Sequence, residues 1–162
     1  SMTKTRAEKI AQYKKGAVLH SDYIHTDYFE YWLNDFTKDG RTLNVCCGAS
    51  EVGDVRLDIS EDTTRTMYGD MFDLPSFRPR EFDYVYCDPD FKYYTSGKNR
   101  FRWQFELFKL ADQCLITRRP KVNVNMPSDW HQYIVLEDSR PSLSLVRLDF
   151  RGRPKSKKEE LV

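Results

Sequence analysis

At 162 residues the chain is long enough for one domain that buries a core without disulfides or a structural metal, and it is short for two domains. Hydrophobic residues make up 40% and charged residues 31% of the sequence, and the formal net charge is +1, so overall charge favours neither nucleic acid nor a membrane, and any basic surface must be local. No segment approaches the roughly 20 apolar residues of a membrane span and no signal-peptide pattern opens the chain, which predicts a cytoplasmic protein without a membrane partner.

The N-terminal part of the chain predicts two helices. Residues 5–15 (TRAEKIAQYKK) form a short basic one, and residues 26–36 (TDYFEYWLNDF) an amphipathic one that Thr26 caps and Gly40 closes. The apolar residues of the second helix recur at helical spacing: Phe29, Trp32, Leu33 and Phe36. They give this helix one face to bury, so we expect residues 1–37 to pack on the remainder of the domain.

The rest of the chain alternates compact β-type runs with short helical or loop segments. The predicted strands are RTLNVCC (41–47), VRLDI (55–59), FDYVYC (82–87), QCLIT (113–117), HQYIVLE (131–137) and SLSLVRLDF (142–150). Residues 102–111 (RWQFELFKLA) have helical periodicity, and residues 138–142 (DSRPS) favour a turn that makes the last two strands antiparallel. This order predicts an α/β sheet, mainly parallel with an antiparallel edge at its C-terminal hairpin. We expect a single domain over residues 1–153 and a mobile charged tail over residues 154–162.

A glycine or an acid follows each of the first three predicted strands, and ligands of open α/β sheets bind outside the carboxyl ends of the strands. Gly48, after the first strand, lets a ligand approach the backbone. Asp58, at the end of the second strand, can accept hydrogen bonds from both hydroxyls of a ribose. One such charge-assisted hydrogen bond is worth roughly 1.5–3 kcal/mol. GASEVG lacks the spacing of a dinucleotide fingerprint and SGKN lacks the rest of a phosphate loop, so the pattern favours a nucleoside without phosphates.

In their order and spacing, LNVCCGAS, VRLDIS, YGDMFDLP and FDYVYCDPDF resemble the class I S-adenosylmethionine (SAM)-dependent methyltransferases, over about residues 41–117. The resemblance implies a Rossmann-like methyltransferase sheet, with SAM as cofactor and S-adenosylhomocysteine (SAH) as product. In that family the glycine after the first strand lies by the methionine part of SAM, the acid after the second holds the ribose, and an Asp with an apolar neighbour before the third contacts adenine. The implied cofactor-binding residues are Cys47, Gly48, Ala49, Asp58, Ile59, Asp70, Met71 and Asp88.

The chain departs from that family at its first strand and in the loop that follows. Family members usually carry an acid early in the first motif and a second glycine two residues after the first, where this chain has Asn44 and Ser50. The connection from Gly48 to Asp58 is short, so we expect the first crossover helix to be reduced to a turn.

The stretch CDPDF (87–91) resembles the Asp-Pro-Pro-Phe/Tyr motif of methyltransferases that modify exocyclic amino groups, chiefly in nucleic-acid bases. The lone pair of such an amine is delocalised into the ring, and a carboxylate and a carbonyl that accept its two N–H groups return electron density to the nitrogen. The resemblance implies that Asp88 accepts the amine, that Pro89 presents the carbonyl from a fixed turn, and that Phe91 stacks on the base. Asp90 stands where the family has a second proline, and Asp-Pro also ends strands in proteins with no catalysis.

The segment after Phe91 interleaves aromatic and basic residues. This mixture suits a single strand or a flipped base, and the predicted substrate-binding residues are Asp90, Tyr93, Tyr94, Lys98 and Arg100. The alternative is a solvated loop that leads into a helix whose Phe101 and Trp103 belong to the core. RRPK (118–121) is either a further phosphate contact or a solvated surface.

The four cysteines lie in apolar runs, with no CxxC pair and no histidine at ligand spacing: Cys46, Cys47, Cys87 and Cys114. This pattern predicts buried free thiols rather than a metal site. Methyl transfer to an amine also needs no metal, because positioning supplies most of the catalysis in such a displacement.

The motifs together predict methyl transfer to an exocyclic amino group of DNA or RNA. Since nearly all of the chain belongs to the catalytic core, specificity would come from the N-terminal helices, the loop after Phe91, a homodimer or a recognition subunit. A methyltransferase of a small molecule or protein, and a non-catalytic SAM-binding subunit, are the alternatives. The compact size suits a virus-encoded enzyme, which would act in the host cytoplasm.

Overall fold

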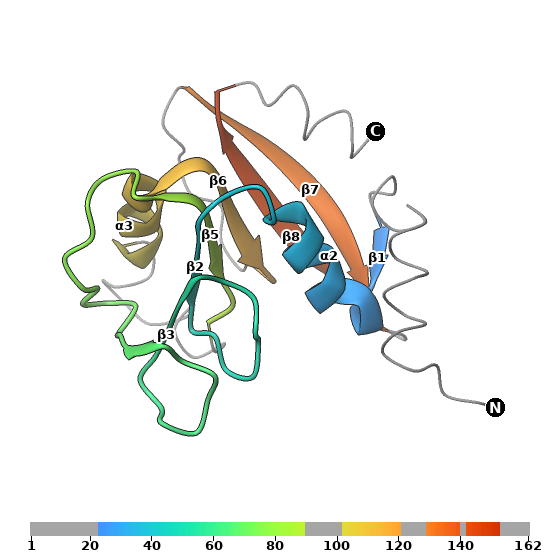
Figure 1. The fold of residues 1–162 in the computed structure, drawn as a ribbon. Coiled ribbons are helices and arrows are strands. Elements are labelled where there is room, and N and C mark those ends of the chain that lie inside the picture. Colours follow the sequence, from blue (N-terminus) through green and yellow to red (C-terminus); the bar gives the residue numbers. More distant parts are fainter. Residues whose placement is uncertain (1–22, 90–101, 121–128, 140–141, 153–162) are drawn as a thin grey trace.

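The computed structural model describes residues 23–89, 102–120, 129–139 and 142–152, and these residues contain one eight-stranded sheet (Figure 1). The strands are β1 (Tyr23–His25), β2 (Thr42–Val45), β3 (Val55–Asp58), β4 (Met67–Tyr68), β5 (Phe82–Cys87), β6 (Ala111–Arg118), β7 (Trp130–Asp138) and β8 (Leu143–Arg151). The helices are α2 (Phe29–Phe36), preceded by a 3-10 turn (Thr26–Tyr28), and α3 (Arg102–Leu110). The predicted basic helix over residues 5–15 and the predicted tail over residues 154–162 lie outside the described residues.

The sheet has the strand order β1-β7-β8-β6-β5-β2-β3-β4. Five of the seven neighbouring pairs are parallel, and β8 runs antiparallel to both β6 and β7. This pattern agrees with the predicted mainly parallel sheet and its antiparallel C-terminal hairpin. The prediction that the hairpin forms the edge was wrong, because β1 pairs in parallel with residues 136–138 of β7 and lies outside it.

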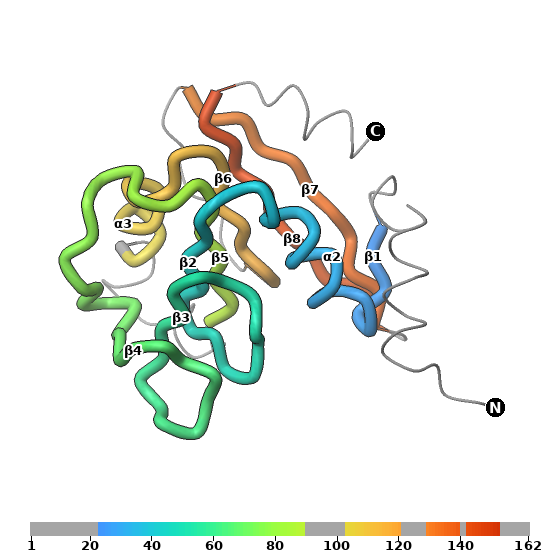
Figure 2. Tube along the Cα trace, in the orientation of Figure 1, coloured from blue at the N-terminus to red at the C-terminus, as the bar shows by residue number. Residues whose placement is uncertain are grey.

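The strand order reverses at β2, as in doubly wound α/β folds. From β2 the chain adds β3 and β4 on one side and then crosses to β5 and β6 on the other. The connection after β2 contains turns and bends but no helix over residues 46–54, in agreement with the expected loss of the first crossover helix. The loops that follow β2 and β3 lie at the same end of the sheet (Figure 2). In sheets of this kind the ligand crevice lies where the order reverses, which here is outside the carboxyl ends of β2 and β5.

The two helices cover opposite faces of the sheet, so the core has two layers (Figure 1). On one face, α2 buries the four apolar residues that its periodicity predicted, against Tyr84 and Tyr86 of β5 among others. On the other face, α3 packs through Trp103, Leu107 and Phe108. Within the described ranges, no helix has the length and apolar character that crossing a bilayer requires.

The ends of α2 differ from their prediction. Thr26 does not cap this helix, which begins three residues later at Phe29. The Thr26 hydroxyl instead donates to Glu137 Oε2 at 2.7 Å, while His25 Nδ1 accepts from the Asp27 amide at the start of the 3-10 turn. The helix ends before Gly40, which is constrained by a neighbour: a Cβ there would lie 2.6 Å from Asp83 Cβ. The C-terminal end of α2 is instead closed locally, by the amide and hydroxyl of Thr37, which both donate to the Leu33 carbonyl.

Candidate functional site

The carboxyl ends of β2 and β3 are joined directly by a hydrogen bond. Gly48, after β2, donates its amide to Asp58 Oδ2 at 3.0 Å. The φ of Gly48 is +54°, a backbone conformation that favours glycine, and a Cβ built there would meet no atom within 4 Å. The space beside Gly48 is therefore open, as the approach of a ligand to the backbone requires.

The Asp58 carboxylate keeps acceptor capacity on both oxygens. Oδ2 accepts from Gly48 and Oδ1 accepts from the Ser60 amide at 3.0 Å. Each carboxylate oxygen has two lone-pair positions, and the described residues use one position on each, which leaves the other for a ligand. Ile59, the next residue, is 52% exposed and offers an apolar surface beside the carboxylate.

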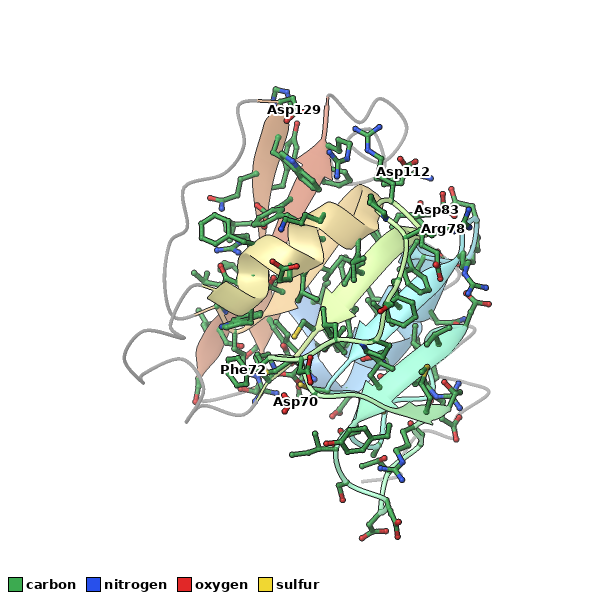
Figure 3. The ribbon with its side chains drawn as sticks, turned by 90° about the vertical axis from the view of Figure 1, so that its left-hand side faces the viewer. Asp70, Phe72, Arg78, Asp83, Asp112 and Asp129 are labelled. Atoms are coloured by element: carbon green, nitrogen blue, oxygen red, sulfur yellow. The ribbon has the colours of Figure 1, made fainter. Side chains whose placement is uncertain are left out.

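Asp70 and Met71 lie at the same end of the sheet. Asp70 Oδ1 accepts from the Phe72 amide at 2.9 Å, which holds the turn after β4. Met71 is buried, with its Sδ 3.6 Å from the Sγ of Cys46 at the end of β2, whereas Phe72 is partly exposed. Figure 3 shows Asp70 and Phe72 at the opposite end of the sheet from Asp83. The sequence pattern indicated Met71, but it carried no sign that Phe72 presents the apolar surface.

The departures from the family motifs at Asn44 and Ser50 contact each other. Asn44 is fully buried, and its Nδ2 donates to Ser50 Oγ at 3.0 Å and to the Val52 carbonyl at 2.8 Å. Ser50 Oγ in turn donates to Glu30 Oε1 of α2 at 2.7 Å. The loop after β2 is therefore anchored to α2 through a chain of side chains that sequence reasoning did not foresee.

Asp88 follows β5 and has a partly used carboxylate. Its side chain is 27% exposed, and its Oδ2 lies 3.4 Å from Arg118 Nη1. Among the described residues, its Oδ1 has no hydrogen-bond partner. Burial raises the pKa of the Asp88 carboxyl, against the opposing charges of Arg118 and Arg119. Pro89, which follows, is buried.

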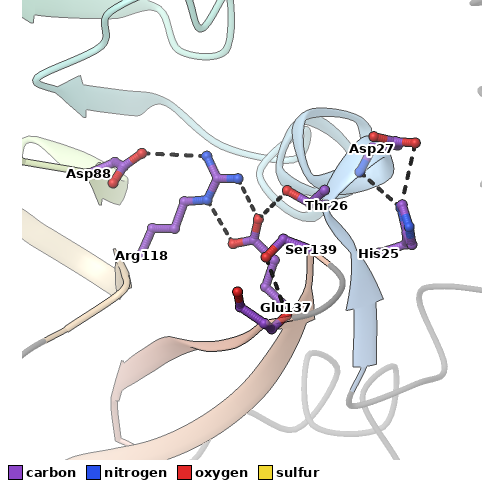
Figure 4. Close-up of polar contacts among 8 residues, drawn as sticks. His25, Thr26, Asp27, Asp88, Arg118, Glu137 and Ser139 are labelled. Carbon is purple, nitrogen blue, oxygen red and sulfur yellow. Dashed lines mark hydrogen bonds and ion pairs between the residues drawn. The ribbon is translucent and has the colours of Figure 1, made fainter.

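Arg118, the last residue of β6, is held between two carboxylates (Figure 4). Its Nε and Nη2 donate to Glu137 Oε1 and Oε2 at 2.8 and 2.5 Å, and its guanidinium lies 4.0 Å from the ring centroid of Phe29. Burial opposes the charge of Arg118, but the bonds to Glu137 outweigh it and raise the pKa of Arg118. The prediction of a phosphate contact or a solvated surface at residue 118 was therefore wrong, since its side chain is 17% exposed and turned inward.

The remaining predicted site residues divide into two groups. Cys47 is buried, and its pKa is raised, chiefly by burial, while Ala49 is exposed.

The predicted substrate contacts and the stacking residue lie outside the described residues: Asp90, Phe91, Tyr93, Tyr94, Lys98 and Arg100. The four cysteines are free thiols, and within the described ranges no group of three His, Cys, Asp or Glu side chains is placed to hold a metal ion.

A separate cleft of about 400 Å³ lies between residues 71–79 and α3. Phe72, Leu74, Phe77, Trp103 and Glu106 are among the residues that line it. It touches the site at Met71 and Phe72, but Gly48, Asp58 and Asp88 do not line it. The cleft is therefore adjacent to the strand ends and is not formed by them.

Comparison with known proteins gives distant likenesses. No protein-family model matches this sequence, and no curated protein matches it significantly. Among solved structures, "Putative methyltransferase yhhF from Escherichia coli" is similar with a TM-score of 0.44 at 12% identity, over 79% of this chain and 84% of that chain. An S-adenosylmethionine-dependent methyltransferase from Clostridium acetobutylicum ATCC 824 is similar with a TM-score of 0.37 at 11% identity, over 93% and 74%.

Proposed function

We propose that the protein is a SAM-dependent methyltransferase that acts on an exocyclic amino group of a nucleic-acid base. One observation carries the proposal: where the strand order reverses, Asp88 presents a carboxylate oxygen that no described residue contacts, at the same edge of the sheet as the Gly48–Asp58 pair. We also propose that residues 1–153 form a single domain.

The described residues fit SAM. The open space at Gly48 would accommodate the methionine part, flanked by Cys47 and Ala49. The two remaining acceptor positions of Asp58 match the two hydroxyls of a ribose. Apolar surface for adenine comes from Ile59 and from the turn at residues 70–72, of which Phe72 is the exposed member.

SAM, when bound, supplies a methyl group on a positively charged sulfur. The protein's part is then to hold and orient the acceptor. In the proposal Asp88 Oδ1 accepts a hydrogen bond from one N–H of the amine, the Pro89 carbonyl accepts one from the other, and Phe91 stacks on the base. As the N–CH3 bond formed and the S–CH3 bond broke, SAH would be the leaving group, and the nitrogen would lose one proton through Asp88 to solvent. The polar, aromatic and basic residues that hold the rest of the nucleic acid are Asp90, Tyr93, Tyr94, Lys98 and Arg100.

The test measures transfer of labelled methyl groups from SAM to DNA, RNA, nucleosides and protein, with the product identified by mass. We expect incorporation into nucleic acid, and SAH binding with a dissociation constant of about micromolar size. Asp88→Ala should keep SAH binding and lower transfer by about 100-fold or more, because it removes the group that orients the amine. Asp112→Ala removes a half-exposed carboxylate at the opposite end of the sheet and should change neither property.

The alternatives give different results in the same experiment. Incorporation into protein or a small molecule alone would reject the nucleic-acid substrate but keep the methyltransferase. SAH binding without transfer to any acceptor would indicate a non-catalytic SAM-binding subunit. If neither SAM nor SAH binds, the cofactor assignment fails as well.

A further inference from the structure

We infer that Arg118 is a positioning residue for Asp88: it holds Oδ2 of the carboxylate and leaves Oδ1 directed to the acceptor amine. This inference rests on the proposed function, in which Asp88 receives the amine. Neither the sequence motifs nor the family resemblance links Arg118, Glu137 or Thr26 to Asp88.

The geometry makes Arg118 a fixed cation. Glu137 binds its guanidinium through two parallel hydrogen bonds of 2.8 and 2.5 Å, whereas Asp88 lies 3.4 Å from the third nitrogen. A fork-to-fork pair of this kind fixes the plane of the guanidinium as well as its position. Asp88 is therefore oriented by a charge that is already held elsewhere, and the longer contact leaves its carboxylate available to a substrate.

The N-terminal segment completes the support of Arg118. The Thr26 hydroxyl donates to Glu137 Oε2 at 2.7 Å (Figure 4). The guanidinium of Arg118 lies 4.0 Å from the centroid of the Phe29 ring. Glu137 is almost fully buried, so its charge needs these partners. Four elements thus converge behind Asp88: the 3-10 turn, α2, β6 and β7.

Three charged side chains act on Asp88, and they make the inference testable by the direction in which the pKa of Asp88 moves: Arg118, Arg119 and Glu137. Tyr86 and Cys87 also face Asp88, but burial raises the pKa of each, so both are neutral while Asp88 titrates; Glu30 of α2 acts on Tyr86. The charge of Arg118 lowers the pKa of Asp88, and the charge of Glu137 raises it. Removing Glu137's charge alone should therefore lower the pKa of Asp88. Removing both charges should raise it, because the effect of Arg118 is the larger of the two.

The experiment compares Glu137→Gln with the double variant Arg118→Gln/Glu137→Gln. The double variant leaves two neutral amides that can bond to each other, and so avoids the lone buried carboxylate that Arg118→Gln alone would create. Glu106→Gln, on the exposed side of α3, is the matched control for loss of a carboxylate. Each protein is measured by carbon-13 NMR titration of the Asp88 carboxyl, by the pH profile of methyl transfer, by SAH binding and by thermal unfolding.

Because the amine needs the ionised carboxylate, the acid limb of the transfer rate should follow the pKa of Asp88. We expect this limb to move to lower pH in Glu137→Gln and to higher pH in the double variant. At the optimum pH the double variant should lose roughly 10- to 100-fold in kcat, since a small misplacement of an orienting group can cost this much. SAH binding should change by less than about twofold, because Gly48 and Asp58 follow β2 and end β3, whereas Arg118 ends β6, which β5 separates from β2.

A purely structural role for Arg118 would lower the thermal stability and leave the pKa of Asp88 and the pH profile in place. That outcome, or shifts in the same direction in both variants, would overturn the inference. A failure of the proposed function is distinguishable, because the wild-type protein would then transfer no methyl group while its NMR titration still reported whether Arg118 and Glu137 move the pKa of Asp88 in opposite directions.

Discussion

Replacing Asp58 by alanine tests the cofactor site most directly. The carboxylate already accepts two backbone amides, from Gly48 and Ser60, and the proposal assigns its two remaining acceptor positions to ribose hydroxyls. A hydrogen bond to a charged group is worth about 1.5–3 kcal/mol, and Asp58 is partly exposed, so each bond belongs at the low end of this range. Two such bonds amount to about 3 kcal/mol, and since about 1.4 kcal/mol corresponds to tenfold in affinity, Asp58→Ala should weaken SAH binding roughly 100-fold.

Isothermal titration calorimetry with SAH measures this change. Asp58→Asn keeps an acceptor for one backbone amide but loses the charge, so its affinity for SAH should lie between those of Asp58→Ala and the wild type. Asp62→Ala removes an equal charge from an exposed position in the same loop and should stay within about twofold of the wild type. Thermal unfolding of each variant separates loss of binding from loss of the loop. Wild-type affinity in Asp58→Ala would refute the assignment of Asp58 to the ribose.

Three further predictions concern the same end of the sheet. Asn44→Asp removes the amide that donates to Ser50 and Val52, and should lower the free energy of unfolding by about 1–3 kcal/mol in urea titrations; an unchanged value would show that the amide is dispensable. Gly48→Ala should cost about 1–2 kcal/mol from its positive φ alone, because no protein atom lies in the way, and calorimetry should show an additional loss of SAH affinity; unimpaired binding would argue against a ligand at Gly48. Burial raises the pKa of Glu137, but bonds from Arg118 and Thr26 outweigh it and lower the pKa below its ordinary 4.5. The stability that these bonds confer is present above pH 4.5 and is lost as the pH falls through the lowered pKa. Glu137→Gln should therefore reduce the acid-side slope of the melting temperature plotted against pH. An unchanged slope would contradict the bonding.

The sequence predicted those strands whose runs of apolar and β-type residues are long enough to be recognised. β2 and β5 are short apolar runs that the sheet buries on both faces, and the sequence DSRPS between the last two strands favours a turn. β1 and β4 were missed because strands of three and two residues carry no periodicity. They exist because β7 and β3 offer them an edge, which is a property of the assembled sheet.

The candidate site was predictable where it depends on strand ends and not where it depends on packing between distant strands. Gly48, Asp58 and Asp88 could be placed together because the carboxyl ends of parallel strands meet at one edge. The pairing of Arg118 with Glu137 could not, because it requires the register of β7 in the sheet and the position of α2 above it. In the sequence, Arg118 lies in a basic run and Glu137 lies just before a predicted turn, and both positions are typical of ordinary surface residues.

The two departures at Asn44 and Ser50 are best understood as one structural change. Without a crossover helix, the loop over residues 46–54 has no helical hydrogen bonds; some of its amides donate to backbone carbonyls, and side chains satisfy other polar groups. Asn44 supplies two donors, and Ser50 both accepts one of them and passes a hydrogen bond on to Glu30. An acid at the first position could not donate, and a glycine at the second would have no hydroxyl. The short connection, Asn44 and Ser50 therefore have a common cause. They form one departure from the methyltransferase motifs and not three independent ones.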